Sequence, residues 1–554
     1  MSCGYTWAAV LVLVFSGSDV RAQPWLAAVA TDNAEASRVG AEILGAGGNA
    51  VDAAVASSLM LGLLNPFASG IGGGGFALVY DAESDETFAL DFRETCPAGV
   101  TTADFADAPA EASRRGGLAV AVPGEIAGLH TLHERFGRLP WADVVAPVLG
   151  AARDGFPAGE LLVQRLDGVA ASDFSQRALA PYRVDDGWVA PGDVVVRSDL
   201  AAFYQLLATD GADAFYAGPV ATDIIRAVNE SGGRMTLDDL QSYRPVWREP
   251  VTIQFQGVRL HQMPLPSSGS VVFQQVLSVF ESVHVERLLP WSTGWFHRLT
   301  LAWGFAFADR AVWAGDPEFI ALDTPPPWLT DDRLRQAESH LSDWLVPDAA
   351  VFGPLTAVMD DDGTSHLSIV DGDGNAVALT TTINTSFGSW VSTPEFGILL
   401  NNEMDDFAVR PGEPNAFGLV GNAANAPEPG KRPLSSMSPT LVFDASGLRG
   451  AIGASGGPQI ITSTMQVLLA VLTGDHPEQA VTRPRIHFQW LPFTIFAEPE
   501  ASVPTYLGVP VQTGPAFSAV QIVWRADADA RSAELPVMWN AASDPRKLGA
   551  PAGI

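Results

Sequence analysis

Thr364 stands at a junction between two unlike stretches of the chain. The acidic run Asp360-Asp361-Asp362-Gly363 precedes it, and an alternating, strand-like run from Ser365 to Val370 follows it. If the chain were cut between Gly363 and Thr364, the new first residue would carry a hydroxyl and a free α-amine together. Such a residue is a nucleophile with its own base, which suits acyl transfer from amides. A threonine alone is weak evidence, because most threonines are structural.

A second set of residues predicts a different nucleophile. Gly453-Ala454-Ser455-Gly456-Gly457 fits the G-x-S-x-G pattern of a serine placed between a strand and a helix. Asp475 and His487 follow in the chain order that many serine hydrolases use. On motif logic alone, a Ser455 hydrolase is the strongest rival to Thr364.

Two glycine-rich motifs predict turns and not ligand sites. Gly70 to Gly75 satisfies the dinucleotide pattern, but a helix precedes it and a strand follows it, the reverse of the order that such a site needs. Asp371-Gly372-Asp373-Gly374-Asn375 opens like a calcium loop but lacks the later glycine and glutamate, so a hairpin turn explains it better. The nine histidines form no zinc-binding pattern, and we expect no metal site.

Several longer segments occur in order along the chain and form one set. They are Ala50-Val51-Asp52-Ala53-Ala54, Gly70 to Phe76, Asp91-Phe92-Arg93-Glu94, Thr382 to Gly388, Asn401 to Phe407, Arg432 to Thr440, and Ala542-Ser543-Asp544-Pro545-Arg546. This set closely resembles the γ-glutamyltransferase (glutathione hydrolase) family. The resemblance runs from about residue 30 to the C-terminus, which is too long and too ordered for chance.

The resemblance implies a fold and a maturation step. The fold is α+β, that of the N-terminal-nucleophile hydrolases: an αββα sandwich in which two stacked, mostly antiparallel sheets lie between helical layers. The precursor would cut itself between Gly363 and Thr364. The products would be a large subunit, about 23–363, and a small catalytic subunit, 364–554, which together form one αββα unit as a heterodimer.

The resemblance also assigns roles to particular residues. Thr364 is the expected nucleophile, Thr382 its hydrogen-bond partner, and Gly456 and Gly457 the backbone donors of the oxyanion hole. The groups expected to hold the substrate are Arg93, Ser435 and Ser436 at its α-carboxylate, and Asn384, Glu403 and Asp406 around its α-amino end. Phe417 falls where the family's lid loop often has a tyrosine, so the ring is kept but its hydroxyl bond is lost.

The chemistry of these residue types agrees with the roles. A γ-glutamyl group presents a zwitterion at one end and a scissile amide at the other. The planar fork of Arg93 suits a carboxylate, and the carboxylates of Glu403 and Asp406 can accept from an ammonium. Anchoring both charges fixes the amide carbon against the Thr364 hydroxyl, and such positioning can lower a barrier by roughly 7–11 kcal/mol.

The expected reaction is a ping-pong transfer. The γ-glutamyl group of glutathione or a related amide moves to Thr364 and then to water, or to an amino acid or dipeptide acceptor. It needs no metal and no organic cofactor. Two alternatives stay open beside the Ser455 hydrolase: a related acylase that acts on glutaryl amides, and an uncut envelope protein that binds γ-glutamyl ligands without catalysis. A glutaryl chain has no α-amine for Glu403 and Asp406, which argues against the acylase.

Composition limits the partners. The 554 residues are 47% hydrophobic and 17% charged, which favours a folded chain with a large core. A net charge of −31 disfavours binding to nucleic acid or to anionic membranes, because both need a basic surface. Cys3 lies in the leader described below, so the mature chain would hold only Cys96 and no internal disulfide.

Particular elements must hold the residues of the expected site. The pattern predicts two helices over about 34–64, strands at Phe76–Tyr80 and Phe88–Phe92, mostly helices over 116–345, an exposed and weakly structured linker over 346–363, strands at Ser365–Val370 and Ala376–Ile383, and a helix at Thr462–Val471. A short apolar run and Val20-Arg21-Ala22 predict a signal peptide over residues 1–22, hence export to the periplasm or beyond. That run is too short to span a membrane comfortably.

Overall fold

The computed structural model describes most of the chain after the predicted leader. The described residues are 24–169, 174, 177–185, 187–282, 290–341, 346–352, 363–413, 415–416, 418–419, 421, 423–501, 503, 508–514, 518–527 and 536–554. The predicted signal peptide and Phe417 lie outside them.

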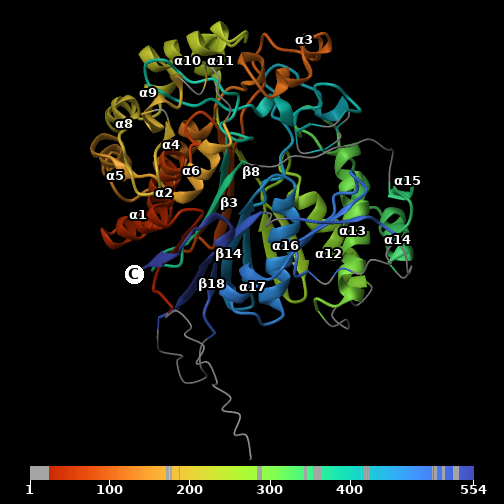
Figure 1. The fold of residues 1–554 in the computed structure, drawn as a ribbon. Coiled ribbons are helices and arrows are strands. Elements are labelled where there is room, and N and C mark those ends of the chain that lie inside the picture. The colour runs from red at the N-terminus through yellow and green to blue at the C-terminus, as the bar shows by residue number, and fades with distance from the viewer. Residues whose placement is uncertain are drawn as a thin grey trace, which may run out of the picture.

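Two antiparallel sheets form the centre of the fold (Figure 1). The seven-stranded sheet has the order β20 (Ala552–Gly553), β1 (Ala28–Thr31), β11 (Ser365–Val370), β12 (Ala376–Thr382), β2 (Gly74–Asp81), β3 (Glu86–Phe92) and β8 (Val246–Arg248). The six-stranded sheet has the order β19 (Trp539–Ser543), β18 (Ala519–Arg525), β14 (Gly447–Ser455), β13 (Thr440–Asp444), β10 (Val258–Gln262) and β9 (Val251–Phe255).

Smaller elements lie outside these two sheets. They are the three-stranded sheet of β15 (Ile486–His487), β16 (Ile495–Ala497) and β17 (Val511–Thr513), and the two-stranded pairs β4 (Phe156–Pro157) with β7 (Val194–Val195) and β5 (Arg183–Val184) with β6 (Gly187–Trp188).

Side chains of the seven-stranded sheet alternate between two hydrophobic cores, because successive residues of a strand point to opposite faces. On β11 and β12, Leu367, Ile369 and Leu379 pack in the core shared with one helical layer. Ala378 and Ala376 face the other core, which the second sheet fills with residues such as those of β13 and β14. The sheets therefore stack face to face, as expected for a sandwich.

Helices cover both outer faces (Figure 1). The layer against the seven-stranded sheet holds α1 (Ala34–Gly45), α2 (Ala50–Leu64), α4 (Glu125–Phe136), α5 (Trp141–Asp154), α6 (Glu160–Asp167), α8 (Ser198–Asp210) and α10 (Gly218–Glu230). The layer against the six-stranded sheet holds α12 (Gly269–Ser282), α13 (Thr293–Trp313), α14 (Asp331–His340) and α16 (Gln459–Leu472). Short helices complete the chain: α3 (Thr102–Ala106), α9 (Asp213–Tyr216), α11 (Leu237–Ser242), α15 (Ala349–Phe352) and α17 (Pro477–Thr482). The predicted αββα sandwich is confirmed.

The structure departs from the sequence-based expectation in two places. Within the stretch expected to be mostly helical, β9 and β10 form a hairpin at the edge of the second sheet. Its turn is Gln256-Gly257, both with positive φ, after an alternating apolar pattern that could have signalled it. In the linker expected to be exposed, Phe352 is buried, with its ring centroid 4.9 Å from that of Phe305. Residues 353–362 of that linker lie outside the described residues.

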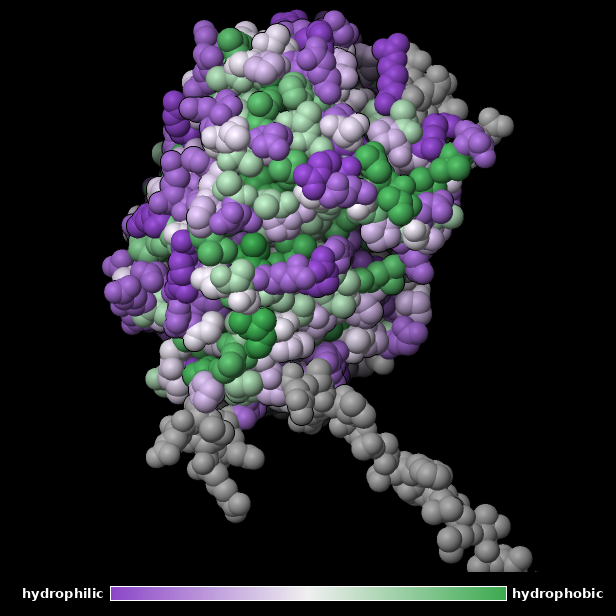
Figure 2. Space-filling view, turned by 90° about the vertical axis from the view of Figure 1, so that its left-hand side faces the viewer, coloured by the Kyte–Doolittle hydropathy of each residue, from purple (hydrophilic) through white to green (hydrophobic). Residues whose placement is uncertain are grey.

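Figure 2 shows one face of the molecule, on which hydrophilic side chains surround smaller hydrophobic areas. No helix in the described part of the chain is both long enough and apolar enough to cross a membrane.

A close backbone contact aligns the end of β12, which carries Thr382, with the start of β2. β12 pairs with β2 up to Thr382, opposite Gly74. A Cβ atom added to Gly73 would lie 1.9 Å from the Thr382 carbonyl oxygen, so only glycine fits there. The carbonyl of Gly73 in turn accepts from the N–H groups of Gly124 and Glu125 at the start of α4.

We expect Gly73→Ala to lower the free energy of unfolding by about 1–3 kcal/mol, because the added methyl group must displace backbone. The matched control is Gly150→Ala in α5, where an added Cβ meets nothing within 4 Å. That control should gain about 0.5–1 kcal/mol from helix propensity. Urea unfolding followed by tryptophan fluorescence measures both, and an unchanged midpoint for Gly73→Ala would contradict the close contact.

Candidate active site

Thr364 directly precedes β11, at the end of the strand that lies beside β12. Its Oγ lies 3.2 Å from Oγ of Thr382, the last residue of β12. Its backbone N–H donates to the carbonyl of Ala68 at 2.9 Å. Both hydroxyls are buried, so this hydrogen bond lies away from bulk water.

Thr382 is itself held by its neighbours. The backbone N–H of Asn384 donates to Thr382 Oγ at 2.8 Å. This bond uses one lone pair of the Thr382 oxygen and leaves its proton available for the contact with Thr364 Oγ, in which either hydroxyl can donate. The Asn384 side chain donates to the Asn402 carbonyl at 2.9 Å, which ties the end of β12 to the next part of the site.

One guanidinium lies among three carboxylates at the other end of the site. Arg93, just after β3, contacts Glu403, lies 2.5 Å from Asp406, and lies 3.4 Å from the neighbouring Glu94. Burial raises the pKa of Glu403 to about 8, with Arg93 opposing the shift. Burial also raises the pKa of Glu94 and of Asp406 above their usual values. One Glu403 oxygen, Oε2, has no hydrogen-bond partner among the described residues.

The structure brings nearly all the predicted residues to one narrow cavity. Those that line it are Arg93, Thr364, Thr382, Asn384, Glu403, Asp406, Ser435, Ser436 and Gly457. Gly456 precedes Gly457 directly after β14, and both have positive φ, which glycine adopts without strain. The lid prediction for Phe417 falls outside the described residues.

Sequence reasoning missed Arg310 of α13, which lines the same cavity. Its Nε donates to Ser268 Oγ at 2.7 Å, and its Nη2 lies 3.4 Å from Ser436 Oγ. Burial lowers the pKa of Arg310 to about 10, a sign of a cation with little charge compensation. An Arg at the end of the apolar run Leu299–Ala308 must find polar partners, and this was the available signal.

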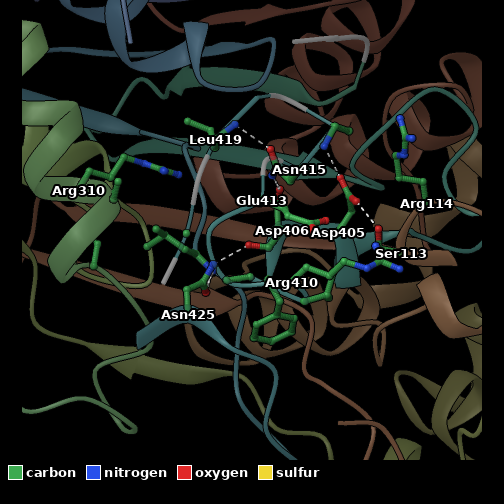
Figure 3. Close-up of a pocket in the computed structure, with 18 of the residues that line it drawn as sticks. Ser113, Arg114, Arg310, Asp405, Asp406, Arg410, Glu413, Asn415, Leu419 and Asn425 are labelled. Carbon is green, nitrogen blue, oxygen red and sulfur yellow. Dashed lines mark hydrogen bonds between the residues drawn. The ribbon is translucent and has the colours of Figure 1, made fainter. Parts of the chain in front are cut away.

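A larger cavity of about 460 Å³ adjoins the first and shares Arg310, Asp406 and Leu419 with it. Figure 3 shows Arg310 extending from α13 into this cavity. Asp405 accepts hydrogen bonds from Ser113 Oγ at 2.6 Å and from the backbone N–H of Ala416 at 2.7 Å. All three residues line this cavity. The larger cavity thus lies next to the one that Thr364 lines.

The rival nucleophile does not assemble a triad. Ser455 Oγ lies 3.4 Å from the Ala519 carbonyl, while His487 bonds to Thr462 and Gln489. Asp475 pairs with Arg483 instead of the histidine. His487 and Asp475 therefore do not activate Ser455, and Gly457 of the same loop lines the Thr364 cavity instead.

Removing the guanidinium should destabilise the fold in a pH-dependent way. We expect Arg93→Met to cost about 3–5 kcal/mol near pH 8, because three buried carboxyls would lose their cation. Their folded-state pKa values would rise further above the unfolded values of about 4, so the folded chain would bind more protons than the unfolded one. Stability then falls as pH rises, and the loss should be smaller at pH 5 than at pH 8.

The control for this measurement is Arg138→Met. Arg138 forms an exposed pair with Asp373 at 2.7 Å, which should contribute less than about 1 kcal/mol and little pH dependence. Urea midpoints at both pH values measure the two variants. Equal losses would mean that the buried cluster carries no special electrostatic cost.

Comparisons with known proteins extend from sequence to structure. A family profile described as gamma-glutamyltranspeptidase matches residues 36–554. The glutathione hydrolase proenzyme of Escherichia coli is 37% identical over 476 residues, covering 84% of this chain and 81% of that protein. The glutathione hydrolase proenzyme of Pseudomonas aeruginosa is 38% identical over 474 residues, covering 84% and 83%.

Two solved structures show the fold. The cephalosporin acylase from Bacillus halodurans is 25% identical, with a TM-score of 0.81 and coverage of 100% of this chain and 99% of that chain. The Helicobacter pylori gamma-glutamyltranspeptidase is 31% identical, with a TM-score of 0.54 and coverage of 58% and 93%. With the profile matched over nearly the whole chain and the predicted residues gathered at one cavity, the chain belongs to the γ-glutamyltranspeptidase family.

Proposed function

We propose that this protein is a γ-glutamyltransferase and glutathione hydrolase whose nucleophile is Thr364. The observation that carries the proposal is the position of Thr364 Oγ, 3.2 Å from Thr382 Oγ, in a cavity that Arg93, Glu403 and Asp406 also line. A hydroxyl nucleophile and a set of charges suited to an amino acid end thus share one small site. The substrates are glutathione and other γ-glutamyl amides; the acceptors are water, amino acids or dipeptides.

Self-cleavage between Gly363 and Thr364 is part of the proposal. Thr364 has φ of +85°, a conformation that costs a β-branched residue about 1–3 kcal/mol. Gly363 is packed so closely that an added Cβ would lie 1.5 Å from the Asn384 carbonyl oxygen. Backbone strain at Thr364, beside its own buried hydroxyl, favours a cleavage that relieves it. The cut would give a large subunit, about 23–363 after removal of the leader, and a small subunit, 364–554.

The proposed reaction follows from this arrangement. The α-amine of the cut chain takes the proton of Thr364 Oγ, and the oxygen bonds to the γ-carbonyl carbon. The backbone N–H groups of Gly456 and Gly457 stabilise the oxyanion, a role worth about 10²–10³ in rate per donor elsewhere. The C–N bond then breaks, and the proton moves to the leaving amine. Water or an acceptor amine later attacks the ester and frees Thr364.

The charges of the site support an amino acid end on the substrate. Three carboxyls surround one guanidinium, and Glu403 Oε2 is buried without a partner among the described residues. A substrate ammonium would supply the missing donor and charge. The substrate carboxylate would then take hydrogen bonds from the hydroxyls of Ser435 and Ser436 and lie beside the positive charge of Arg93.

The proposed self-cleavage can be tested directly. The purified protein should contain a small subunit that begins Thr364-Ser365-His366, shown by intact mass and N-terminal sequencing. Thr364→Ala should stay uncut and lose hydrolysis of γ-glutamyl-anilide, because no hydroxyl is left to attack. Thr364→Ser is the matched control, since it keeps the hydroxyl and should still be cut. Turnover by Thr364→Ala would refute the proposal, and an uncut, inactive wild type would favour a binding protein.

The likeness to a cephalosporin acylase makes a glutaryl-type acylase the second candidate. We expect γ-glutamyl-anilide to exceed glutaryl-anilide in kcat/KM by at least about 100-fold, because a glutaryl chain leaves the buried carboxyls without an ammonium. Glu403→Gln should narrow this ratio, whereas Glu395→Gln, at an exposed pair with Arg226, should leave it unchanged. A preference for the glutaryl compound in the wild type would favour the acylase.

A further inference from the structure

Lysine is rare in this chain: only Lys431 and Lys547 occur, and the other 30 basic residues are arginines. Lys547 ends the short 3-10 helix Pro545–Lys547, far along the chain from the nucleophile. Its Nζ donates to the carbonyl oxygen of Thr364 at 2.5 Å and lies 3.2 Å from Asp32 Oδ2. One of only two lysines therefore contacts the backbone of the candidate nucleophile, and its side chain is only 11% exposed.

The lysine pairs with a carboxylate that is fixed from two sides. Asp32 follows β1 and is 1% exposed. Its second oxygen accepts from Gln521 Nε2 of β18 at 2.6 Å, so the carboxyl bridges the two sheets. Burial raises the pKa of Asp32, and the ammonium of Lys547 opposes that rise. Asp32 thus orients Lys547 and offsets part of its charge.

A cation at this place acts on the reacting end of the cut chain. Within one residue the carbonyl oxygen and the α-nitrogen are only three covalent bonds apart, which keeps them within roughly 4 Å of each other. The Lys547 ammonium that donates to that oxygen therefore lies close to the new α-amine, and like charges disfavour the protonated form of the amine. The hydrogen bond also fixes the peptide plane after Thr364 when the peptide bond before Thr364 has been cut.

We propose that Lys547 is a positioning residue: it holds the carbonyl of Thr364 and keeps the α-amine of the cut chain unprotonated near neutral pH, so that the amine can act as base. This inference rests on the proposed function, because the α-amine exists only after cleavage at Gly363–Thr364. It assigns the base strength of the nucleophile to a pair of residues, Asp32 and Lys547, that lies outside the substrate cavity.

Other charged groups also face this end of Thr364. From the substrate side they are Arg93, Glu403, Asp406 and Arg310, which line the same cavity as Thr364. The turn before β2 contributes only the neutral carbonyl of Ala68, which accepts from the Thr364 N–H. These groups stay unchanged when Lys547 or Asp32 is substituted, so a shift in pH dependence can be assigned to the pair.

The test measures kcat/KM for γ-glutamyl-anilide against pH in Lys547→Met, Lys547→Arg and Asp32→Asn, each shown by intact mass to be cut at Thr364. Activity falls on the acid side as the base is protonated. Loss of the cation in Lys547→Met should raise the apparent pKa of this acid limb by about one unit. Loss of the anion in Asp32→Asn should move it the other way, and Lys547→Arg should stay near the wild type.

The matched control is Lys431→Met. Lys431 is the other lysine, with a side chain that is only 1% exposed, but it pairs with Glu428 at 2.8 Å and does not contact Thr364. The acid limb of the Lys431→Met variant should therefore not move. Opposite shifts of the apparent pKa in the Lys547 and Asp32 variants support the proposal. A purely structural role would not move the pKa in opposite directions when a cation and an anion are removed. Lower activity with an unmoved limb in both overturns it. If Lys547→Met stays uncut while the wild type is cut, the direction of the Asp32→Asn shift decides alone.

Discussion

The ladder between β11 and β12 is the constraint on which the site depends. These strands pair from Ser365 with Thr381 to Val370 with Ala376, and this register sets the Thr364 hydroxyl beside that of Thr382. A shift by one residue would turn every side chain of β11 to the opposite face. The buried apolar residues on both faces exclude such a shift, because each face fills a separate core. The position of the Thr364 hydroxyl is thus specified by the packing of the whole sandwich.

The buried charges of the site are not balanced pair by pair, and the stability of the fold does not require such an arrangement. Arg93 is nearly inaccessible and shares its guanidinium among three carboxyls, while Arg310 is buried with little compensation. Buried groups of this kind cost stability in the absence of a ligand. Their arrangement fits the proposed function, in which the ammonium and the carboxylate of a zwitterionic substrate would complete the set. In the free protein, the burial of apolar side chains in the cores on both sides of the seven-stranded sheet offsets this unfavourable contribution.

The sequence predicted the sandwich and most of the cavity, because both rest on local patterns or on contiguous motifs. Thr364, Thr382, Glu403 and Asp406 each lie in a recognisable segment, and the structure gathers them. Arg310 and Lys547 were missed because their roles depend on partners far away in the chain, Ser436 for one and Thr364 for the other. The β9–β10 hairpin was missed for a different reason: its alternation is short and stands between helical stretches. Hydrophobic periodicity predicts the type of a secondary-structure element. It does not predict which distant residue a charged side chain will contact.

The order of strands in the seven-stranded sheet has a consequence for whether the cut molecule could refold after it has opened. β11, β12 and β20 come from the C-terminal side of Thr364, and they are interleaved with β1 and β2 from the other side. If the peptide bond before Thr364 is cut as proposed, the two pieces cannot separate without breaking the hydrogen bonds of a continuous sheet. Folding of the intact precursor is a first-order event, whereas renaturing two separated pieces is second-order and depends on their concentration. The mature protein would therefore be a one-time assembly, whose lifetime is set by how slowly it opens and not by how readily it could re-form.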